Sequence, residues 1–344
     1  MSILKSIETL RRVQLTGGGT LIVSLPKEWT KRVGLKPGDY VSFISEPDGS
    51  LRVQPSTKPT VEKESTSITI DRGVTSTVVI RELMSRYLSG YKSITIMLKS
   101  YTPSIMNVLR EAVSKKLVGA EIIEEEKDKI VIQILVNIHE LPTPTIIKRM
   151  VRVVDGMIYD TLYALSNFDE GVLNSVIDRD DIVDKFYLYV VRQLNSVIRG
   201  LYRPQDVGLQ NLREILEYRA LSKSIERIGD HAQKLAKNIM EIGKQGTKLP
   251  NEITGNIVKL GEEIRGCFNE AVKSFLEKNK ELAHKVLITI ETDVDKKVES
   301  IINRSILASL DYMSIMSLGL IEDSLRRILD YSMDIAELAI DMTA

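Results

Sequence analysis

Pairs of acidic residues four positions apart recur in the C-terminal half of the chain. Asp180 and Asp184 form one pair, and Glu226 and Asp230 form another. Four positions are about one helical turn, so the two members of a pair lie on one helix face, where like charges destabilise an isolated helix. Carboxylates from facing helices repel one another unless cations lie between them, and hard or borderline metal ions take such oxygen ligands. The spacing therefore predicts a site for divalent or trivalent metal ions.

The pattern occurs a second time nearer the C-terminus. Glu291 and Asp295 follow the first pair at an offset of 111 residues, and Asp330 follows Asp230 at an offset of 100 residues. Arg326 occupies the position that corresponds to the glutamate of the first copy. A guanidinium group does not ligate a cation and pairs with carboxylates instead. The repeat predicts a second metal site that is weaker, rebuilt with other acidic residues nearby, or empty.

An alternative interpretation of these pairs needs no metal. Charged residues at four-residue spacing are common on helix surfaces, where they are solvated or paired with arginine and lysine. The matching offsets of the two copies favour the metal site over this alternative. His231, beside Asp230 in the sequence, is interpreted as a surface side chain rather than as a further ligand.

Six long helices are expected to position the acidic residues. Apolar residues recur in three- and four-residue steps over 224–242, which is typical of a helix packed in a bundle. Thr143 and Pro144 supply an N-cap and a first-turn proline where the helical region begins. The helices are expected at about 144–166, 170–200, 206–243, 251–278, 280–308 and 311–342. They make up a domain over 143–344 with two repeated three-helix bundles, at about 143–246 and 251–342.

A small α/β domain is expected over residues 62–140. A polar, proline-punctuated segment, PSTKPTVEKEST, precedes it as a linker. Strand-forming and helix-forming runs then follow in the order βαβαββ, with Gly90 and Gly119 after the two helices. This order predicts an α/β sandwich with its helices on one face of the sheet. The segment shows no constellation of metal-ligating side chains, so a spacing or dimerisation role is expected.

Residues 1–56 are expected to form a third, small domain. Two strand-like runs flank the glycines 17–19 as a hairpin, Pro26 opens a short helix, and two further strands lie on either side of Asp48 and Gly49. So few elements bury little apolar surface, and the unit is therefore expected to share its core with a second copy. Its eight basic residues exceed its five acidic residues by three.

The segments RRVQLTGGGTLIVSLPKEWTKRVGLKPGDYVSF and DGSLRVQP resemble the AbrB/SpoVT-type DNA-binding domain in its archaeal form. The resemblance implies a swapped-hairpin β-barrel that forms a homodimer and lays basic residues on DNA. Because the charge surplus is modest, contact with phosphates depends on the doubling that dimerisation brings. The alternative is a barrel that only dimerises and whose charges are solvated. The candidate DNA-binding residues are Arg11, Arg12, Lys27, Lys31 and Arg32.

The duplicated helical unit with its acidic pairs, together with the phrase IERIGDHA at 225–232, resembles the PhoU phosphate-regulatory family. The resemblance covers about residues 143–342. It implies six helices in two related bundles, bound clusters of iron, zinc or magnesium ions, and control of phosphate uptake. Carried onto this sequence, it assigns a first metal site to Asp180, Asp184, Glu226 and Asp230, and a second to Glu291, Asp295 and Asp330.

The bulk composition excludes several other classes of protein. Lysine plus arginine equal aspartate plus glutamate at 47 each, so the net charge does not by itself indicate binding to nucleic acid or to an anionic membrane, and any basic patch must be local. The single cysteine, Cys267, excludes an intrachain disulfide and suits a reducing cytoplasm. No apolar run approaches the ~20 residues that are needed to cross a bilayer.

A carboxylate-bridged di-metal enzyme is disfavoured as the function. Ferritin-like sites of that kind need a pair of Glu-x-x-His motifs, whereas the helical region contains one, from Glu281 to His284. The sequence therefore predicts a mainly helical, multidomain, non-enzymatic regulator in the cytoplasm, which binds DNA and metal ions and answers to phosphate status. The alternative is an interaction module whose barrel only dimerises and whose helical part binds a phosphate transporter or a signalling protein.

Overall fold

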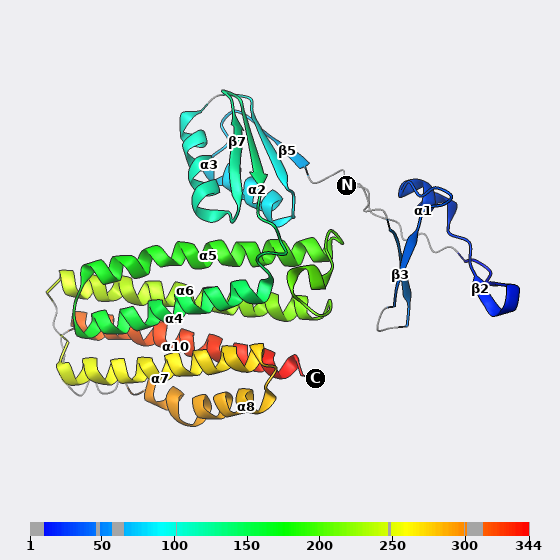
Figure 1. Cartoon of the computed structure of the whole chain (residues 1–344). Helices are drawn as coiled ribbons and strands as arrows, with labels where there is room; N and C mark the ends of the chain where they lie inside the picture. Colours follow the sequence, from blue (N-terminus) through cyan, green and yellow to red (C-terminus); the bar gives the residue numbers. More distant parts are fainter. Residues whose placement is uncertain are drawn as a thin grey trace. The chain divides into compact units, whose positions relative to one another are not determined.

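The computed structural model describes residues 10–45, 49–56, 65–100, 102–246, 249–298, 300 and 312–343. The chain divides into two compact units, Met1–Lys63 and Glu64–Ala344. Helices make up most of the described residues (Figure 1), so the predicted mainly helical, multidomain fold is confirmed. Within these ranges no helix has the length and apolar character that crossing a membrane requires.

The first unit consists of two β-hairpins and a short helix. Its elements are β1 Gln14–Thr16, η1 Gly17–Gly19, β2 Thr20–Ile22, α1 Lys27–Arg32, β3 Val41–Ser45 and β4 Leu51–Pro55. Strands β1 and β2 pair antiparallel, and so do β3 and β4. Gly18 has a φ angle of 70°, a left-handed conformation that glycine adopts without strain and that turns the chain between β1 and β2.

The apolar residues of this first unit are open to solvent in the single chain. None of its described residues is buried, and Leu15, Leu21 and Phe43 are 72%, 68% and 58% exposed. Exposed apolar side chains on both hairpins are covered when a second copy supplies opposing strands. The swapped-hairpin homodimer stays a prediction, and this exposure favours it.

The second unit begins with the predicted βαβαββ order. The elements are β5 Ser65–Ile70, α2 Ser76–Leu88, β6 Ser93–Leu98, α3 Pro103–Lys116, β7 Ala120–Glu125 and β8 Lys129–Ile134. In the sheet the strands lie in the order β5-β6-β8-β7, with β5 and β6 parallel and the other neighbours antiparallel. Alternate residues of β6, including Ile94 and Ile96, are buried under α2 and α3, which pack against each other. The burial alternates because successive side chains of a strand point to opposite faces.

Helices make up most of the remaining described residues of the second unit (Figure 1). The elements are α4 Thr143–Ser166, α5 Glu170–Ile198, η2 Pro204–Val207, α6 Glu214–Lys244, α7 Asn251–Leu276, α8 Lys280–Thr289, η3 Ile290–Val294 and α10 Tyr312–Asp341. Helices α4, α5 and α6 pack together as one bundle, and α7, α8 and α10 as the other. The bundles join because α4 packs against α7 and α6 packs against α10.

The helix expected at 206–243 begins later than predicted, at Glu214. Gly208 takes a left-handed conformation with a φ angle of 81°, which ends the short η2 turn. The Asn211 side chain then accepts hydrogen bonds from the backbone N–H groups of Arg213 and Glu214, at 3.0 and 3.2 Å. The boundary was wrong because the start of a helix depends on such local hydrogen bonds, which the apolar pattern does not report.

The helix expected at 280–308 is interrupted in the structure. It is α-helical as far as Thr289 and then forms the π-helical turn η3. Residues 301–308 of the expected helix lie outside the described ranges. A π-helical turn accommodates one residue more than an α-helical turn, and it therefore changes which side chains share a face.

Helix α5 carries the contacts that attach the α/β domain to the bundle. Arg192, which is 7% exposed, donates hydrogen bonds to the carbonyl groups of Tyr87 and Gly90, the latter at 3.2 Å. Asn195 donates to the Leu88 carbonyl at 3.0 Å. These acceptors lie at the C-terminal end of α2, where helix carbonyls lack intrahelical partners and carry partial negative charge. The α/β domain is therefore fixed to the helix that also carries the first acidic pair.

Candidate metal centre

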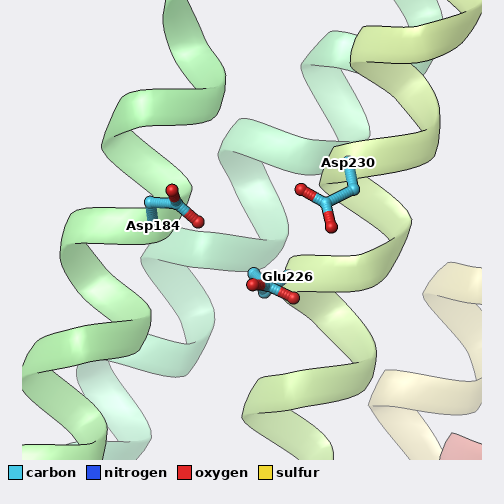
Figure 2. A group of neighbouring side chains, drawn as sticks. All are labelled: Asp184, Glu226 and Asp230. Atoms are coloured by element: carbon cyan, nitrogen blue, oxygen red, sulfur yellow. The ribbon is translucent and has the colours of Figure 1, made fainter. Parts of the chain in front are cut away.

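Three of the predicted carboxylates lie together between α5 and α6. Asp184 extends from α5, and Glu226 and Asp230 extend from α6 (Figure 2). Each residue has one carboxylate oxygen in the group, and these three oxygens all lie within 4.8 Å of one another. Glu226 is buried, with 8% of its surface exposed, and the two aspartates are partly buried. Three converging carboxylate oxygens form a ligand set that hard and borderline cations accept.

Asp180 is coupled to this group from the preceding turn of α5. It is not one of the three residues whose oxygens converge within 4.8 Å. Burial, followed by the negative charges of Asp184 and Asp230, raises the pKa of Asp180 to about 7. Burial, followed by the charges of Glu226 and Asp230, raises the pKa of Asp184 to about 6. The negative charges of Glu226 and Asp230 on α6 thus act on both aspartates of α5.

A glycine on α6 allows the two helices to approach closely beside the carboxylates. Ile225 and Ile228 are fully buried and fix the rotation of α6. A Cβ atom added at Gly229 would lie 3.3 Å from Cγ1 of Val183 on α5 and 3.5 Å from Cγ2 of Val154 on α4. No role of Gly229 was predicted from the sequence. Its position directly before the aspartate in IERIGDHA is the signal that would have identified it.

Positively charged side chains of α6 also reach the acidic group. Lys223 Nζ donates to both oxygens of Glu226, at 2.7 and 2.6 Å. The Arg227 guanidinium lies 3.9 Å from an oxygen of Glu226 and 3.9 Å from an oxygen of Asp230. Lys223 was not among the predicted site residues either. It precedes Glu226 by three residues, so the two side chains lie on the same face of α6.

The second repeat arranges its charges differently in the described part of the chain. Arg326 Nη1 lies 3.0 Å from Asp295, and its Nη2 atom lies 3.3 Å from Glu322. The Arg327 guanidinium lies 3.4 Å from Asp330. Asp295 and Asp330 therefore face arginines of α10, and they are not gathered into a group of converging carboxylates as in the first repeat.

Glu291, the remaining predicted ligand of the second site, lies in the π-helical turn η3 and is exposed. Asp295 directly follows this turn and is partly buried. The spacing of four positions predicts a shared face only in a regular α-helix, because the π-helical turn changes the angle between successive side chains. The structure does not bring Glu291 into a cluster with Asp295 and Asp330.

His231 is not the surface side chain that the sequence predicts. It is 7% exposed, and its ring centroid lies 6.0 Å from that of Tyr331 on α10. Its Nδ1 atom has no hydrogen-bond partner among the described residues. Burial lowers the pKa of His231, and the positive charge of Lys234 lowers it further. The side chain lies between the two repeats and does not belong to the carboxylate group.

The predicted DNA-binding residues are all exposed in the first unit. Arg11 and Arg12 precede β1, and Lys27, Lys31 and Arg32 lie on α1. Exposed basic side chains are free to contact phosphate groups, which fix the position of a protein on DNA without reading its sequence. Their role in DNA binding stays a prediction.

Known protein families match both ends of the chain. The PhoU domain family matches residues 147–239 and 257–339, which together make up just over half of the 344 residues. The family described as antidote-toxin recognition MazE, bacterial antitoxin, matches residues 14–60. The second match confirms a MazE/AbrB-like domain at the N-terminus.

Three curated relatives match part of this chain, and each is named as a phosphate-specific transport system accessory protein PhoU homolog. The protein from Clostridium acetobutylicum is 29% identical over 155 residues, which is 45% of this chain and 68% of the relative. That from Aquifex aeolicus is 27% identical over 139 residues, 40% of this chain and 60% of the relative. That from Thermotoga maritima is 22% identical over 158 residues, 45% of this chain and 66% of the relative.

A solved structure shares the fold of the helical region. The crystal structure of PhoU from Pseudomonas aeruginosa aligns with a TM-score of 0.50 at 22% identity, and it covers 58% of this chain and 93% of that chain. The two stretches that match the PhoU domain fall on the two helical repeats, each within one bundle. This chain therefore belongs to the PhoU family.

Proposed function

We propose that this PhoU-family protein is a DNA-binding, metal-binding regulator of phosphate uptake. The observation that carries the metal part is the group of Asp184, Glu226 and Asp230, whose oxygens converge within 4.8 Å. Carboxylates this close repel one another, and a multivalent cation offsets the repulsion. The names of the relatives, as accessory proteins of a phosphate-specific transport system, support a regulatory role and a phosphate transport or signalling partner.

The helical unit supplies the metal-binding half of this function. A bound iron, zinc or magnesium ion supplies positive charge between α5 and α6. Asp184 on α5, with Glu226 and Asp230 on α6, each offers an oxygen ligand, and Asp180 adds negative charge from the next turn. Because the ligands come from two helices, binding stabilises the contact between them. Helix α5 also binds the α/β domain through Arg192, so the same helix contacts that domain and supplies a ligand to the proposed metal centre.

We assign metal binding to the first repeat alone. The second predicted site, at Glu291, Asp295 and Asp330, has Arg326 3.0 Å from Asp295. A permanently charged guanidinium already balances the carboxylates there and repels an added cation.

The first unit supplies the DNA-binding half. We propose that the exposed apolar side chains Leu15, Leu21 and Phe43 are covered in a homodimer. Two copies double the surplus of three positive charges to about six on this domain pair. Phosphate contacts made by these basic side chains would release counterions, so the proposed binding depends steeply on salt.

Elemental analysis of the purified full-length protein tests the metal assignment. Asp184→Ala and Glu226→Ala are expected to lose the metal that the wild-type protein retains. Asp181→Asn is the matched control, because Asp181 is an exposed carboxylate of α5 outside the convergent group. An unchanged metal content in both alanine variants would refute the assignment.

Gel-shift and footprinting experiments on promoters of phosphate-uptake genes test the DNA assignment. We expect binding that is tighter than to random duplex and that weakens steeply with salt. The double variant Arg11→Ala, Arg12→Ala is expected to reduce both the affinity and the salt dependence. Binding no tighter than to random duplex would remove the DNA half of the proposal.

An interaction module is the second candidate function. The modest positive charge of residues 1–56 favours this candidate, since the segment contains eight basic and five acidic residues. In this case the barrel only dimerises, and the helical unit binds a phosphate transporter or signalling protein directly. A flat salt dependence of any DNA binding would favour this candidate over the first.

A further inference from the structure

The acidic group of the first repeat contains a cation of its own. Lys223 Nζ lies 2.7 Å from one oxygen of Glu226 and 2.6 Å from the other, so the ammonium group faces both acceptor atoms at once. Glu226 is the most buried of the three convergent carboxylates. A buried carboxylate is costly without a partner, and Lys223 supplies that partner when no metal is present.

The position of Lys223 conflicts with a metal ion on the same carboxylate. A metal ion binds a carboxylate oxygen at about 2.0 to 2.5 Å, which is closer than the ammonium group lies now. With both cations on Glu226, two positive charges would be separated by only a few ångströms in a partly buried place, where their repulsion is weakly screened. The ammonium group therefore has to leave Glu226 when a metal ion enters.

An aromatic ring on α5 provides a place for the displaced ammonium group. Lys223 Nζ already lies 5.0 Å from the ring centroid of Tyr187. A lysine ammonium within about 6 Å of an aromatic centroid is attracted to the ring face. Arg219 donates to the Tyr187 hydroxyl at 2.6 Å and fixes the position of the ring. Tyr187 follows Asp184 by three residues, so the ring and the metal ligand belong to neighbouring turns of α5.

We propose that Lys223 is an internal counter-ion that a metal ion must displace from Glu226, and that it thereby sets the metal affinity of the site. This inference rests on the proposed metal-binding function. Lys223 stabilises the metal-free protein and weakens metal binding by the same interaction. Tyr187 reduces that weakening, because it stabilises the ammonium group after displacement.

Titration of the full-length protein with Mn²⁺ alone, with free Mn²⁺ followed by its paramagnetic resonance signal, tests this proposal. Lys223→Met keeps the length of the side chain and removes its charge, and it is expected to tighten Mn²⁺ binding by about tenfold or more. The metal-free variant is expected to unfold at a lower temperature than the wild type, because Glu226 loses its partner. Lys223→Arg keeps a cation in place and should leave the affinity close to that of the wild type.

Lys237→Met is the matched control for the loss of one charge from α6. Whereas Lys223 bonds directly to Glu226, Lys237 donates a hydrogen bond to Gln233 at 2.7 Å, and its charge acts on Asp180 at the edge of the site. Its substitution should change Mn²⁺ affinity by less than about threefold, as expected of a partly screened charge. Equal effects of the two methionine substitutions would mean that net charge alone matters, and this result would overturn the proposal.

A double-mutant cycle tests the part played by Tyr187. Tyr187→Leu is expected to weaken Mn²⁺ binding about two- to fivefold in the wild-type background, since the displaced ammonium group loses its aromatic partner. It should have no effect in the Lys223→Met background. The same loss in both backgrounds would contradict displacement toward the ring.

The outcomes separate this proposal from the function on which it rests. Equal Mn²⁺ affinity of the wild type and Lys223→Met refutes the counter-ion role and leaves the metal site standing. If Lys223→Met binds Mn²⁺ and the wild type does not, the result supports both the metal site and the counter-ion role, because the variant lacks the ammonium group that competes with the metal ion. If neither protein binds Mn²⁺, both the site and the counter-ion role are refuted.

Discussion

The two helical repeats share one sequence pattern, but their acidic residues have different charged partners. In the first repeat, Glu226 and Asp230 of α6 converge with Asp184 of α5. In the second, Arg326 takes the place of the glutamate and lies 3.0 Å from Asp295. The guanidinium of Arg227 in the first repeat lies 3.9 Å from Glu226 and from Asp230, whereas that of Arg326 in the second lies at hydrogen-bond distance from its carboxylate. The carboxylates of the second repeat are therefore more directly neutralised by the chain.

A second difference lies at the residue before the shared aspartate. The first repeat has Gly229 there, and the second has Leu329, which is buried. Gly229 lets α6 come close to α5, as the 3.3 Å distance between an added Cβ and Val183 shows. The two repeats therefore differ both in the charged partners of their carboxylates and in the residue size beside the shared aspartate.

The largest effect is expected from copying the arginine of the second repeat into the first. Glu226→Arg replaces a ligand with a permanent cation beside Asp184 and Asp230. We expect Mn²⁺ affinity to fall by more than about 100-fold, because a ligand is lost and a like charge is added. Titration with Mn²⁺ checks the prediction, with Asp181→Asn as the control. Retained affinity would show that the metal site lies elsewhere.

The reverse substitution should give the second repeat a metal site. Arg326→Glu restores the glutamate of the first repeat and leaves Asp295 without its nearest guanidinium. The metal content, measured by elemental analysis after dialysis against Mn²⁺, is expected to rise from one site to two per chain. Lys285→Glu is the control, because it makes the same change of charge at an exposed position of α8, away from Asp295 and Asp330. A rise of equal size in the control would contradict the assignment.

The close approach of α6 is tested by giving the first repeat the leucine of the second. Gly229→Leu introduces a side chain where the added Cβ already lies 3.3 Å from Val183. We expect a loss of about 1 to 3 kcal/mol in the free energy of unfolding, and weaker Mn²⁺ binding, because overpacking separates the helices. Chemical denaturation and titration measure the two effects.

Gly255→Leu is the matched control for this substitution. Gly255 lies in α7, and an added Cβ there meets no atom within 4 Å. The control should therefore leave unfolding and Mn²⁺ binding nearly unchanged. Equal losses in the two leucine variants would show that the close approach at Gly229 has no special role.

A further expected effect is a pH dependence of the metal-free protein. The pKa of Asp180 is raised to about 7 and that of Asp184 to about 6, mainly by burial. Both groups therefore bind protons more tightly in the folded chain than in the unfolded chain, whose aspartates titrate near 4. Their contribution to stability is lost as the pH rises from about 4 to about 7.

Denaturation of the metal-free protein at several pH values measures this loss. The double variant Asp180→Asn, Asp184→Asn is expected to flatten the dependence in that range, and saturating Mn²⁺ is expected to reverse it in the wild type. A stability that rises steadily from pH 4 to 7 in the metal-free wild type, with the same slope in the variant, would contradict the coupling.

The sequence was sufficient for the architecture because the helices and strands follow regular patterns. Apolar steps of three and four residues predicted the six helical segments, and the βαβαββ order predicted the small sheet. The start of α6 at Glu214 was missed, since it depends on Gly208 and the hydrogen bonds of Asn211. Local dihedral angles and side-chain bonds of this kind leave little trace in hydrophobic periodicity.

The candidate site was predictable to the extent that it depends on spacing. The i, i+4 pairs indicated Asp184, Glu226 and Asp230, which converge in the structure. Spacing on one helix does not report how deeply a side chain is buried, so the buried state of Glu226 and its pairing with Lys223 on the same helix were missed. The same limit explains the burial of His231, which results from the packing of α6 against α10.

The most direct test of the single metal centre is anomalous scattering from crystals of the full-length protein grown with saturating Mn²⁺. The account predicts one strong anomalous peak per chain, bounded by Asp184, Glu226 and Asp230, and no peak beside Asp295 and Asp330. A peak in the second repeat alone, or no peak between α5 and α6, would contradict it.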